Sequence, residues 1–182
     1  TNVLVINQEL WEEAGLTEED IPTHLTDLPE ICRQVKENTD AYGYFPLYTE
    51  VGSLRLYFLD AGVPLFNEDR TKAAFNTPKG VKVLKLFTDL YKDGLVPREA
   101  LTATHRRPLE LYKTRRLAAL DTAPQFLRQI KGDAPDIYEN SIVVPRLQWP
   151  GEQRYAVSVH VLGVSNKTEH PELAAELAYF IA

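Results

Sequence analysis

Hydrophobic residues recur at two different spacings along this chain, and segments of the two kinds alternate. Short apolar or alternating runs predict strands at residues 3–6, 43–48, 72–75, 117–120, 142–144 and 155–164. Segments with an apolar residue every three or four positions predict helices at residues 8–14, 26–35, 51–61, 78–92, 108–112, 124–130 and 170–182. Strands that alternate with helices predict an α/β domain, in which helices flank a mixed sheet.

The helix with the clearest ends is predicted within residues 72–97. Asn76 or Thr77 can cap its first turn, and Pro78 fits the first helical position. Gly94 supplies the left-handed residue that ends many helices. Five apolar residues share one face and predict the side that packs into the core: Val83, Leu84, Phe87, Leu90 and Tyr91.

Composition narrows the class of protein. A chain of 182 residues with 44% apolar residues predicts one domain of ordinary size with a real core. The net charge of −6 argues against a nucleic-acid backbone as a partner. The single cysteine, Cys32, rules out a disulfide framework, and no apolar run or leader predicts a membrane span or signal peptide. The abrupt opening strand and the final helix predict a chain cut from a longer protein.

The usual enzyme motifs are missing from the sequence. It contains no GxSxG, no P-loop, no GxGxxG after a strand and no HExxH, and its four histidines are scattered. Acidic clusters lie in predicted connectors or on helix faces, where exposure to solvent explains them without a functional role. The sequence therefore predicts no catalytic residue, no metal site and no cofactor.

Polar residues at two predicted corners between a strand and a helix, and within one long predicted strand, form candidate binding groups. In open α/β sheets, ligands bind beyond the carboxyl ends of strands, where the N-termini of helices offer free N–H groups. The first group is Tyr48, Thr49, Glu50, Gly52 and Ser53; the second is Asp121, Thr122, Gln125 and Phe126; the third is Ser158 and His160.

Structural roles for several of these side chains stay open. Thr49, Ser53 and Thr122 can equally be helix caps. Tyr48 and Phe126 can stack on a sugar ring or fill the core. His160 lies on an apolar strand, where a buried histidine of the core is common.

Four segments in order carry a resemblance to a known family. They are residues 3–16, residues 59–66, residues 73–97 and residues 162–174. The third, with AAFNTP and LYKDGLVP, is the closest match. Together they resemble the extracellular solute-binding proteins of ABC importers, in the sugar-binding group that includes maltose-binding protein.

The resemblance implies a periplasmic-binding-protein type II fold with two lobes. Residues 1–182 would form a single α/β lobe, the second (C-terminal) one, and the first lobe would lie outside this chain. A small extracellular solute, a sugar or polyol, would be captured between the lobes without catalysis or a cofactor. The implied partners are the membrane permease subunits of an ABC transporter, with no nucleic acid, and the implied state is a monomer that is periplasmic or a cell-surface lipoprotein.

The chain departs from the family at a residue that contacts sugar. Where the family has the tryptophan of a GPW motif, this chain has Gln125 after Ala123-Pro124, and Phe126 is the candidate replacement. Two alternatives stay open. One is an α/β hydrolase-like enzyme with Asp121 or His160 as the catalytic residue, and the other is a sensory or protein-docking module.

Overall fold

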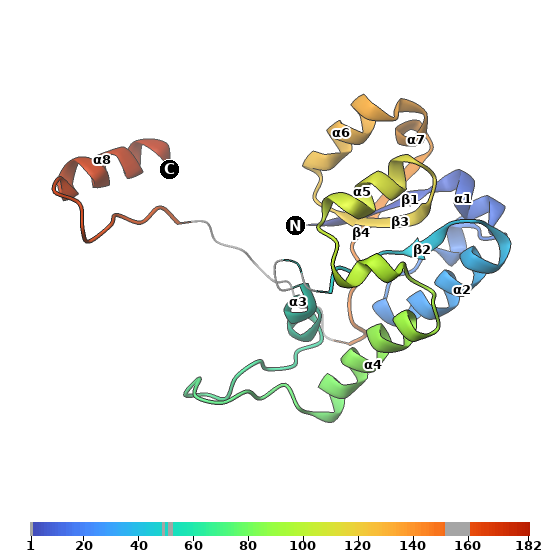
Figure 1. Cartoon of the computed structure of the whole chain (residues 1–182), viewed down its shortest axis with the longest axis horizontal. Helices are drawn as coiled ribbons and strands as arrows, with labels where there is room; N and C mark the ends of the chain where they lie inside the picture. Colours follow the sequence, from blue (N-terminus) through green and yellow to red (C-terminus); the bar gives the residue numbers. More distant parts are fainter. Residues whose placement is uncertain (1, 49, 51–52, 152–160) are drawn as a thin grey trace.

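A four-stranded mixed sheet organises the protein. The computed structural model describes residues 2–48, 50, 53–151 and 161–182 (Figure 1). The strands are β1 (Val3–Asn7), β2 (Tyr42–Tyr44), β3 (Leu117–Thr122) and β4 (Ser141–Pro145), in the order β2-β3-β1-β4. β1 is antiparallel to both neighbours, whereas β2 and β3 are parallel. The carboxyl ends of β2, β3 and β4 therefore lie at the same end of the sheet as the amino end of β1. This end of the sheet is called here the shared strand edge.

Helices cover both faces of this sheet. The helices of the described residues are α1 (Gln8–Glu13), α2 (Leu28–Asn38), α3 (Ser53–Asp60), α4 (Pro78–Lys92), α5 (Arg106–Lys113), α6 (Gln125–Asp133), α7 (Pro135–Glu139) and α8 (Pro171–Ile181), of which α8 lies away from the sheet (Figure 1). Short 3-10 turns occupy Glu18–Asp20, Leu25–Asp27 and Arg98–Leu101. In Figure 1, α5, α6 and α7 lie above the sheet, and α2 and α4 lie below it. The predicted α/β class with a mixed sheet is confirmed.

The alternation of side chains along β1 explains the two helical layers. Leu4 and Ile6 pack with α2 and α4, and Val5 packs with α5 and α6 on the opposite face. All three residues are fully buried. Because successive side chains of a strand point to opposite faces, a run of consecutive apolar residues requires cover on both sides. No helix among the described residues is long and apolar enough to cross a membrane.

α4 confirms the helix with the clearest sequence signals, although its buried face is narrower than predicted. The Thr77 hydroxyl accepts a hydrogen bond from the Gly80 backbone N–H at 3.0 Å, and Gly94 has a φ of +65°. Val83, Phe87 and Leu90 are buried, but Leu84 is 38% exposed. The prediction that Leu84 packs into the core was wrong, because the core contacts only the side of α4 that carries Val83, Phe87 and Leu90.

Several predicted strands are shorter than expected or missing. β2 ends at Tyr44 because Pro46, two residues on, has no N–H to donate to a ladder. The strand predicted at 72–75 is reduced to one isolated bridge between Phe66 and Ala73. Residues 161–164 are not in a strand, and the rest of the strand predicted at 155–164 lies outside the described residues. The helix α7 was not predicted.

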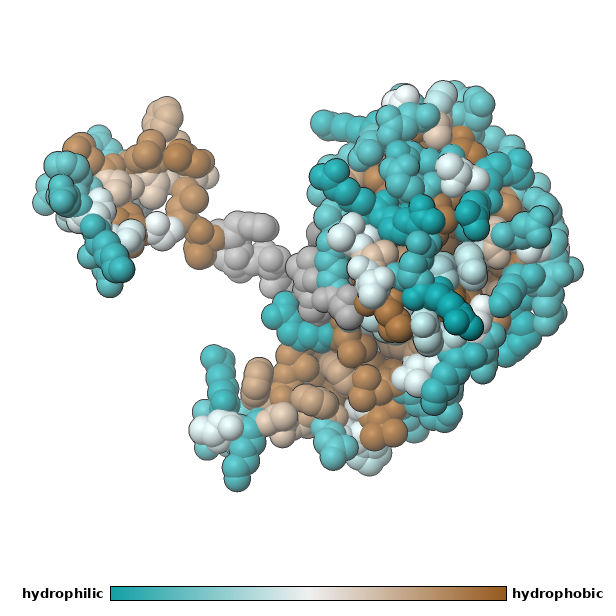
Figure 2. All heavy atoms as spheres, viewed as in Figure 1, coloured by the Kyte–Doolittle hydropathy of each residue, from teal (hydrophilic) through white to brown (hydrophobic). Residues whose placement is uncertain are grey.

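The final helix, α8, is present as predicted but does not join the core. Residues 161–182 contain no buried residue. The apolar side chains of α8 face solvent, with Leu177 58% exposed and Phe180 88% exposed. Figure 2 shows these apolar residues on α8, apart from the body of the molecule, and a second apolar region around α3 and α4. A helix with such a face has the pattern of one that packs against another body.

Candidate functional site

Polar residues gather at the shared strand edge, where β2, β3 and β4 end and β1 begins. Asn2 precedes β1, Asp121 lies one residue before the end of β3, and Arg146 directly follows β4. Val3 is paired with Thr122 on one side and with Pro145 on the other, so the register brings these residues together. The edge is the type of position at which open α/β sheets bind ligands.

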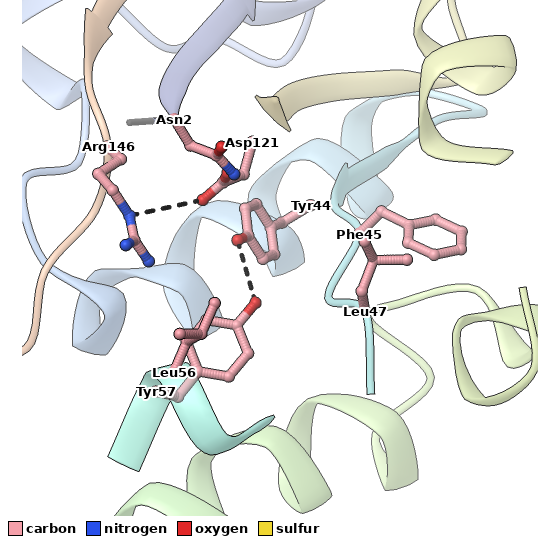
Figure 3. A pocket seen from close by; sticks show the side chains of 8 residues that line it. All are labelled: Asn2, Tyr44, Phe45, Leu47, Leu56, Tyr57, Asp121 and Arg146. Atoms are coloured by element: carbon pink, nitrogen blue, oxygen red, sulfur yellow. Dashed lines mark hydrogen bonds and ion pairs between the residues drawn. The ribbon is translucent and has the colours of Figure 1, made fainter. Parts of the chain in front are cut away.

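A charge cluster links this edge to the end of α3. The Arg146 Nη2 donates to Asp60 Oδ2 at 2.8 Å, and the Arg146 Nε lies 4.0 Å from Asp121 Oδ2 (Figure 3). The Asn2 side-chain amide donates to Asp121 Oδ1 at 2.5 Å. The side chains of Asp60 and Arg146 are only 2% and 16% exposed. The cluster of Asp60, Asp121 and Arg146, called here the Arg146 cluster, is therefore largely removed from water.

Burial governs the protonation of the Arg146 cluster. It raises the pKa of both Asp121 and Asp60 above the ordinary aspartate value, and attraction to the Arg146 guanidinium opposes this shift. Burial lowers the pKa of Arg146, but the carboxylates of Asp121 and Asp60 outweigh it, so the pKa is raised. Two carboxyl groups share one guanidinium, which leaves the cluster with a formal charge of −1 when all three groups are ionised.

A cavity of about 60 Å³ opens beside the Arg146 cluster. Its lining combines polar, aromatic and aliphatic residues: Asn2, Tyr44, Phe45, Leu47, Leu56, Tyr57, Asp121 and Arg146 (Figure 3). The hydroxyl oxygens of Tyr44 and Tyr57 are 3.5 Å apart. Burial raises the pKa of both phenols above the ordinary tyrosine value, so they stay protonated at neutral pH. The cavity thus offers hydroxyl groups, a carboxylate and aromatic surface.

A second polar group lies around Glu50. One Glu50 carboxylate oxygen contacts His105 Nδ1 at 2.7 Å, and the other accepts a hydrogen bond from the His105 backbone N–H. The His105 ring also lies against the ring of Phe126, with centroids 5.8 Å apart. Glu50 and Phe126 belong to two different predicted groups, and His105 brings them to one place.

The predicted site residues lie in different places and have different contacts in the structure. Asp121 lines the cavity, and Glu50 and Phe126 meet at His105. Tyr48 has a structural role, because its hydroxyl donates to the Phe87 backbone carbonyl at 2.7 Å. Thr122 is buried and Gln125 is exposed, and Ser53 is the first residue of α3. Thr49, Gly52, Ser158 and His160 lie outside the described residues.

Sequence reasoning missed most of the cavity. Arg146 directly follows a strand, so the rule on strand carboxyl ends indicates it, but it leads into a loop and not into a helix, unlike the two predicted groups at corners between a strand and a helix. Tyr44 and Tyr57 lie within elements whose aromatic residues are typical of a core. Asp60 ends α3, and no local signal indicates that an arginine 86 residues away would pair with it.

Residues 1–182 match the family described as bacterial extracellular solute-binding protein. The chain belongs to this family. Its members are binding proteins rather than enzymes, and their family places them outside the bacterial cytoplasm. Among curated relatives of this solute-binding chain, a provisionally assigned binding protein of Brucella abortus (strain 2308) is 23% identical over 170 residues, which are 91% of this chain and 41% of the relative.

Solved structures agree on the fold of this solute-binding chain. A provisionally assigned oligosaccharide periplasmic-binding protein of Synechococcus sp. MITs9220 is 31% identical, with a TM-score of 0.86 over 99% of this chain and 45% of its own. An ABC transporter solute-binding protein of Thermotoga lettingae TMO, bound with α-D-tagatose, is 25% identical with a TM-score of 0.72, over 99% of this chain and 47% of its own. The chain therefore spans less than half the length of these relatives.

Among the described residues, no group of histidine, cysteine, aspartate or glutamate side chains is arranged to hold a metal ion. The Glu50–His105 pair is a carboxylate and a histidine within hydrogen-bonding distance, but it contains neither residue named for the enzyme alternative, and neither partner lines the cavity of the Arg146 cluster. Membership of a family of binding proteins decides against the enzyme alternative.

Proposed function

We propose that this chain is part of the substrate-binding component of an ABC importer and forms one wall of a sugar-binding cleft. The cavity at the shared strand edge carries the proposal, since it combines a carboxylate, an arginine and tyrosine hydroxyls with aromatic surface. Proteins bind ligands at such sites through a few placed polar groups and much apolar contact. The relative described as an oligosaccharide-binding protein and the relative bound with α-D-tagatose support a sugar as the solute.

The exposed face of α8 supports an arrangement in two lobes. Among the described residues, all of the buried core lies within residues 2–151, whereas α8 exposes its apolar side chains. We infer that residues 2–151 are the lobe and that α8 packs against a part of the whole protein that this chain does not include. This refines the expectation of a single lobe over residues 1–182. Closure of the two lobes around a solute then follows the hinge motion common in periplasmic binding proteins.

The same proposal sets the partners and the location. The whole protein would deliver its solute to the permease subunits of an ABC transporter, as a monomer, in the periplasm or as a lipoprotein on the cell surface. Asp121 and Arg146 would bond solute hydroxyl groups, and Phe126 beside His105 would offer an aromatic face.

A thermal-shift screen of the full-length protein tests the proposal. The screen would compare sugars, polyols and short peptides at millimolar concentration. A ligand that binds only the folded state must raise the melting temperature. We expect at least one sugar to raise it by several degrees. A screen in which only peptides raise the melting temperature, or in which no sugar or polyol does, would contradict the proposal.

A further inference from the structure

We propose that the cavity of the Arg146 cluster is a subsite for an uncharged hydroxyl-bearing substituent and that it makes the protein reject anionic sugars. The anionic sugars meant are sugar acids, which carry a carboxylate where a neutral sugar has a hydroxymethyl group. The inference rests on the proposed function, because it assumes that the solute is a sugar. It adds the charge of the solute and names the residues that select it.

The first step concerns the charge of the cavity. Arg146 is the single cation among its lining residues. This guanidinium already bonds Asp60 and faces Asp121, so an added anion would compete with two carboxylates for it. With two carboxyl groups for one guanidinium, an added carboxylate would meet like charge in a site largely removed from water. Burial raises the pKa of Asp60 and Asp121, because removal from water disfavours the charged form of a carboxyl group, although attraction to Arg146 opposes this shift.

The second step concerns the hydrogen-bonding groups. Asp121 accepts hydrogen bonds, whereas the amide of Asn2 and the hydroxyls of Tyr44 and Tyr57 can donate them. A solute hydroxyl both donates and accepts, so it can bond an acceptor and a donor of this lining at once. A carboxylate only accepts, and it would leave Asp121 facing another anion.

The third step concerns size. A cavity of about 60 Å³ holds a few water molecules, which is close to the size of one hydroxymethyl group. It therefore suits one protruding substituent, such as a hydroxymethyl group, while the ring lies outside against the wider edge of the sheet. Oxidation of that substituent to a carboxylate changes its charge but hardly its size. Comparison of a neutral sugar with its sugar acid therefore isolates the electrostatic contribution to binding.

Matched titrations of the full-length protein test the inference. Isothermal calorimetry would compare D-glucose, D-galactose and maltotriose with D-glucuronate, D-galacturonate and trigalacturonate. We expect the best neutral sugar to bind at least tenfold more tightly than every sugar acid. A sugar acid that binds as tightly as the best neutral sugar would overturn the inference while leaving sugar binding intact. If none of these sugars or sugar acids binds, and no sugar or polyol of the thermal-shift screen binds either, both this inference and the proposed function are overturned.

A variant assigns the selectivity to the cluster. Asp121→Asn removes one charge with little change of shape, so we expect the ratio of neutral to acidic affinity to fall at least threefold, because sugar acids bind more tightly. Asp133→Asn is the matched control, since Asp133 pairs with Lys113 away from the cavity, and it should leave the ratio unchanged. If Asp121→Asn leaves the ratio unchanged, the assignment to Asp121 is wrong. Should the variant not fold, the comparison of sugars with the unmodified protein still decides the inference.

Discussion

Arg146 shows how one side chain can hold together segments that are far apart in the sequence. Its guanidinium pairs with Asp60 at the end of α3 and faces Asp121 in β3, and all three side chains are shielded from water. The Nε of Arg146 and the Oδ1 of Asp60 have no hydrogen-bond partner among the described residues. A buried ion pair that is incompletely bonded adds little net stability, but removal of one partner strands the other charge.

The first prediction follows from that stranded charge. Arg146→Met should lower the free energy of unfolding by about 3 kcal/mol at pH 7, because Asp60 and Asp121 lose their cation. Urea denaturation measures the change. Arg33→Met is the matched control, since Arg33 pairs with Glu30 on the exposed surface and such pairs contribute almost nothing. Equal changes in the free energy of unfolding for the two variants would mean that burial of the Arg146 cluster does not determine the cost of losing the arginine.

The second prediction concerns pH. Burial raises the pKa of Asp121 in the folded protein, so the folded state binds its proton more readily than the unfolded state does. The contribution of Asp121 to stability is therefore fully present below the ordinary aspartate pKa and is lost as the pH rises through the raised value. The unfolding free energy of the unmodified protein, minus that of Asp121→Asn, should grow as the pH falls from 7 toward 4. Urea denaturation at several pH values measures this difference, and a constant or shrinking difference would refute the sign.

At the scale of elements, β2 and α2 approach each other closely at Gly43. A Cβ atom at this position would lie 2.6 Å from the Cys32 Cα, and a backbone atom cannot move aside as a side chain can. Gly132, in α6, has no atom within 4 Å of the equivalent position. The two glycines therefore differ in what their missing side chain permits.

The third prediction uses this difference. Gly43→Ala should destabilise the protein by about 2 kcal/mol, because α2 must shift away from the sheet. Gly132→Ala should stabilise it by about 0.5–1 kcal/mol, because alanine is the better helix former. Chemical denaturation of both variants measures the pair of changes. A neutral Gly43→Ala would show that α2 is not held against β2 as closely as described.

Local signals predicted most elements, and long-range pairing explains the rest. α4 was predictable because Thr77, Pro78 and Gly94 mark its ends chemically. The exposure of Leu84 was not predictable, since a helical stripe does not tell how far the neighbouring layer extends. Asp121 was found because it lies at a strand end, whereas its link to Asp60 depends on the register of β1 against β3 and β4.

At the scale of the whole molecule, α8 is the element that this chain leaves uncovered. Its apolar residues are exposed, and the chain spans less than half the length of its solved relatives. A solvent-exposed leucine contributes little to stability, whereas the same leucine buried against another lobe contributes much. The effect of a substitution in α8 should therefore depend on whether the rest of the protein is present.

The fourth prediction compares the two forms of the protein. Leu177→Ala should change the unfolding free energy of the 182-residue chain by less than about 0.5 kcal/mol, because Leu177 is 58% exposed. In the full-length protein, the same substitution should cost about 2–4 kcal/mol through loss of packing. Glu176→Ala is the control and should have little effect in either form. An equally small effect of Leu177→Ala in both forms would contradict the packing proposed for α8.

The most direct test of the central claim is calorimetric titration of the same sugar into the full-length protein and into the isolated 182 residues. The sugar would be the one that gives the largest thermal shift with the full-length protein. A cleft between two lobes surrounds its solute, whereas one wall makes only part of the contacts. We predict micromolar binding by the full-length protein and binding at least a hundredfold weaker by the isolated chain. Equal affinity in the two forms would show that the solute is not held between two lobes.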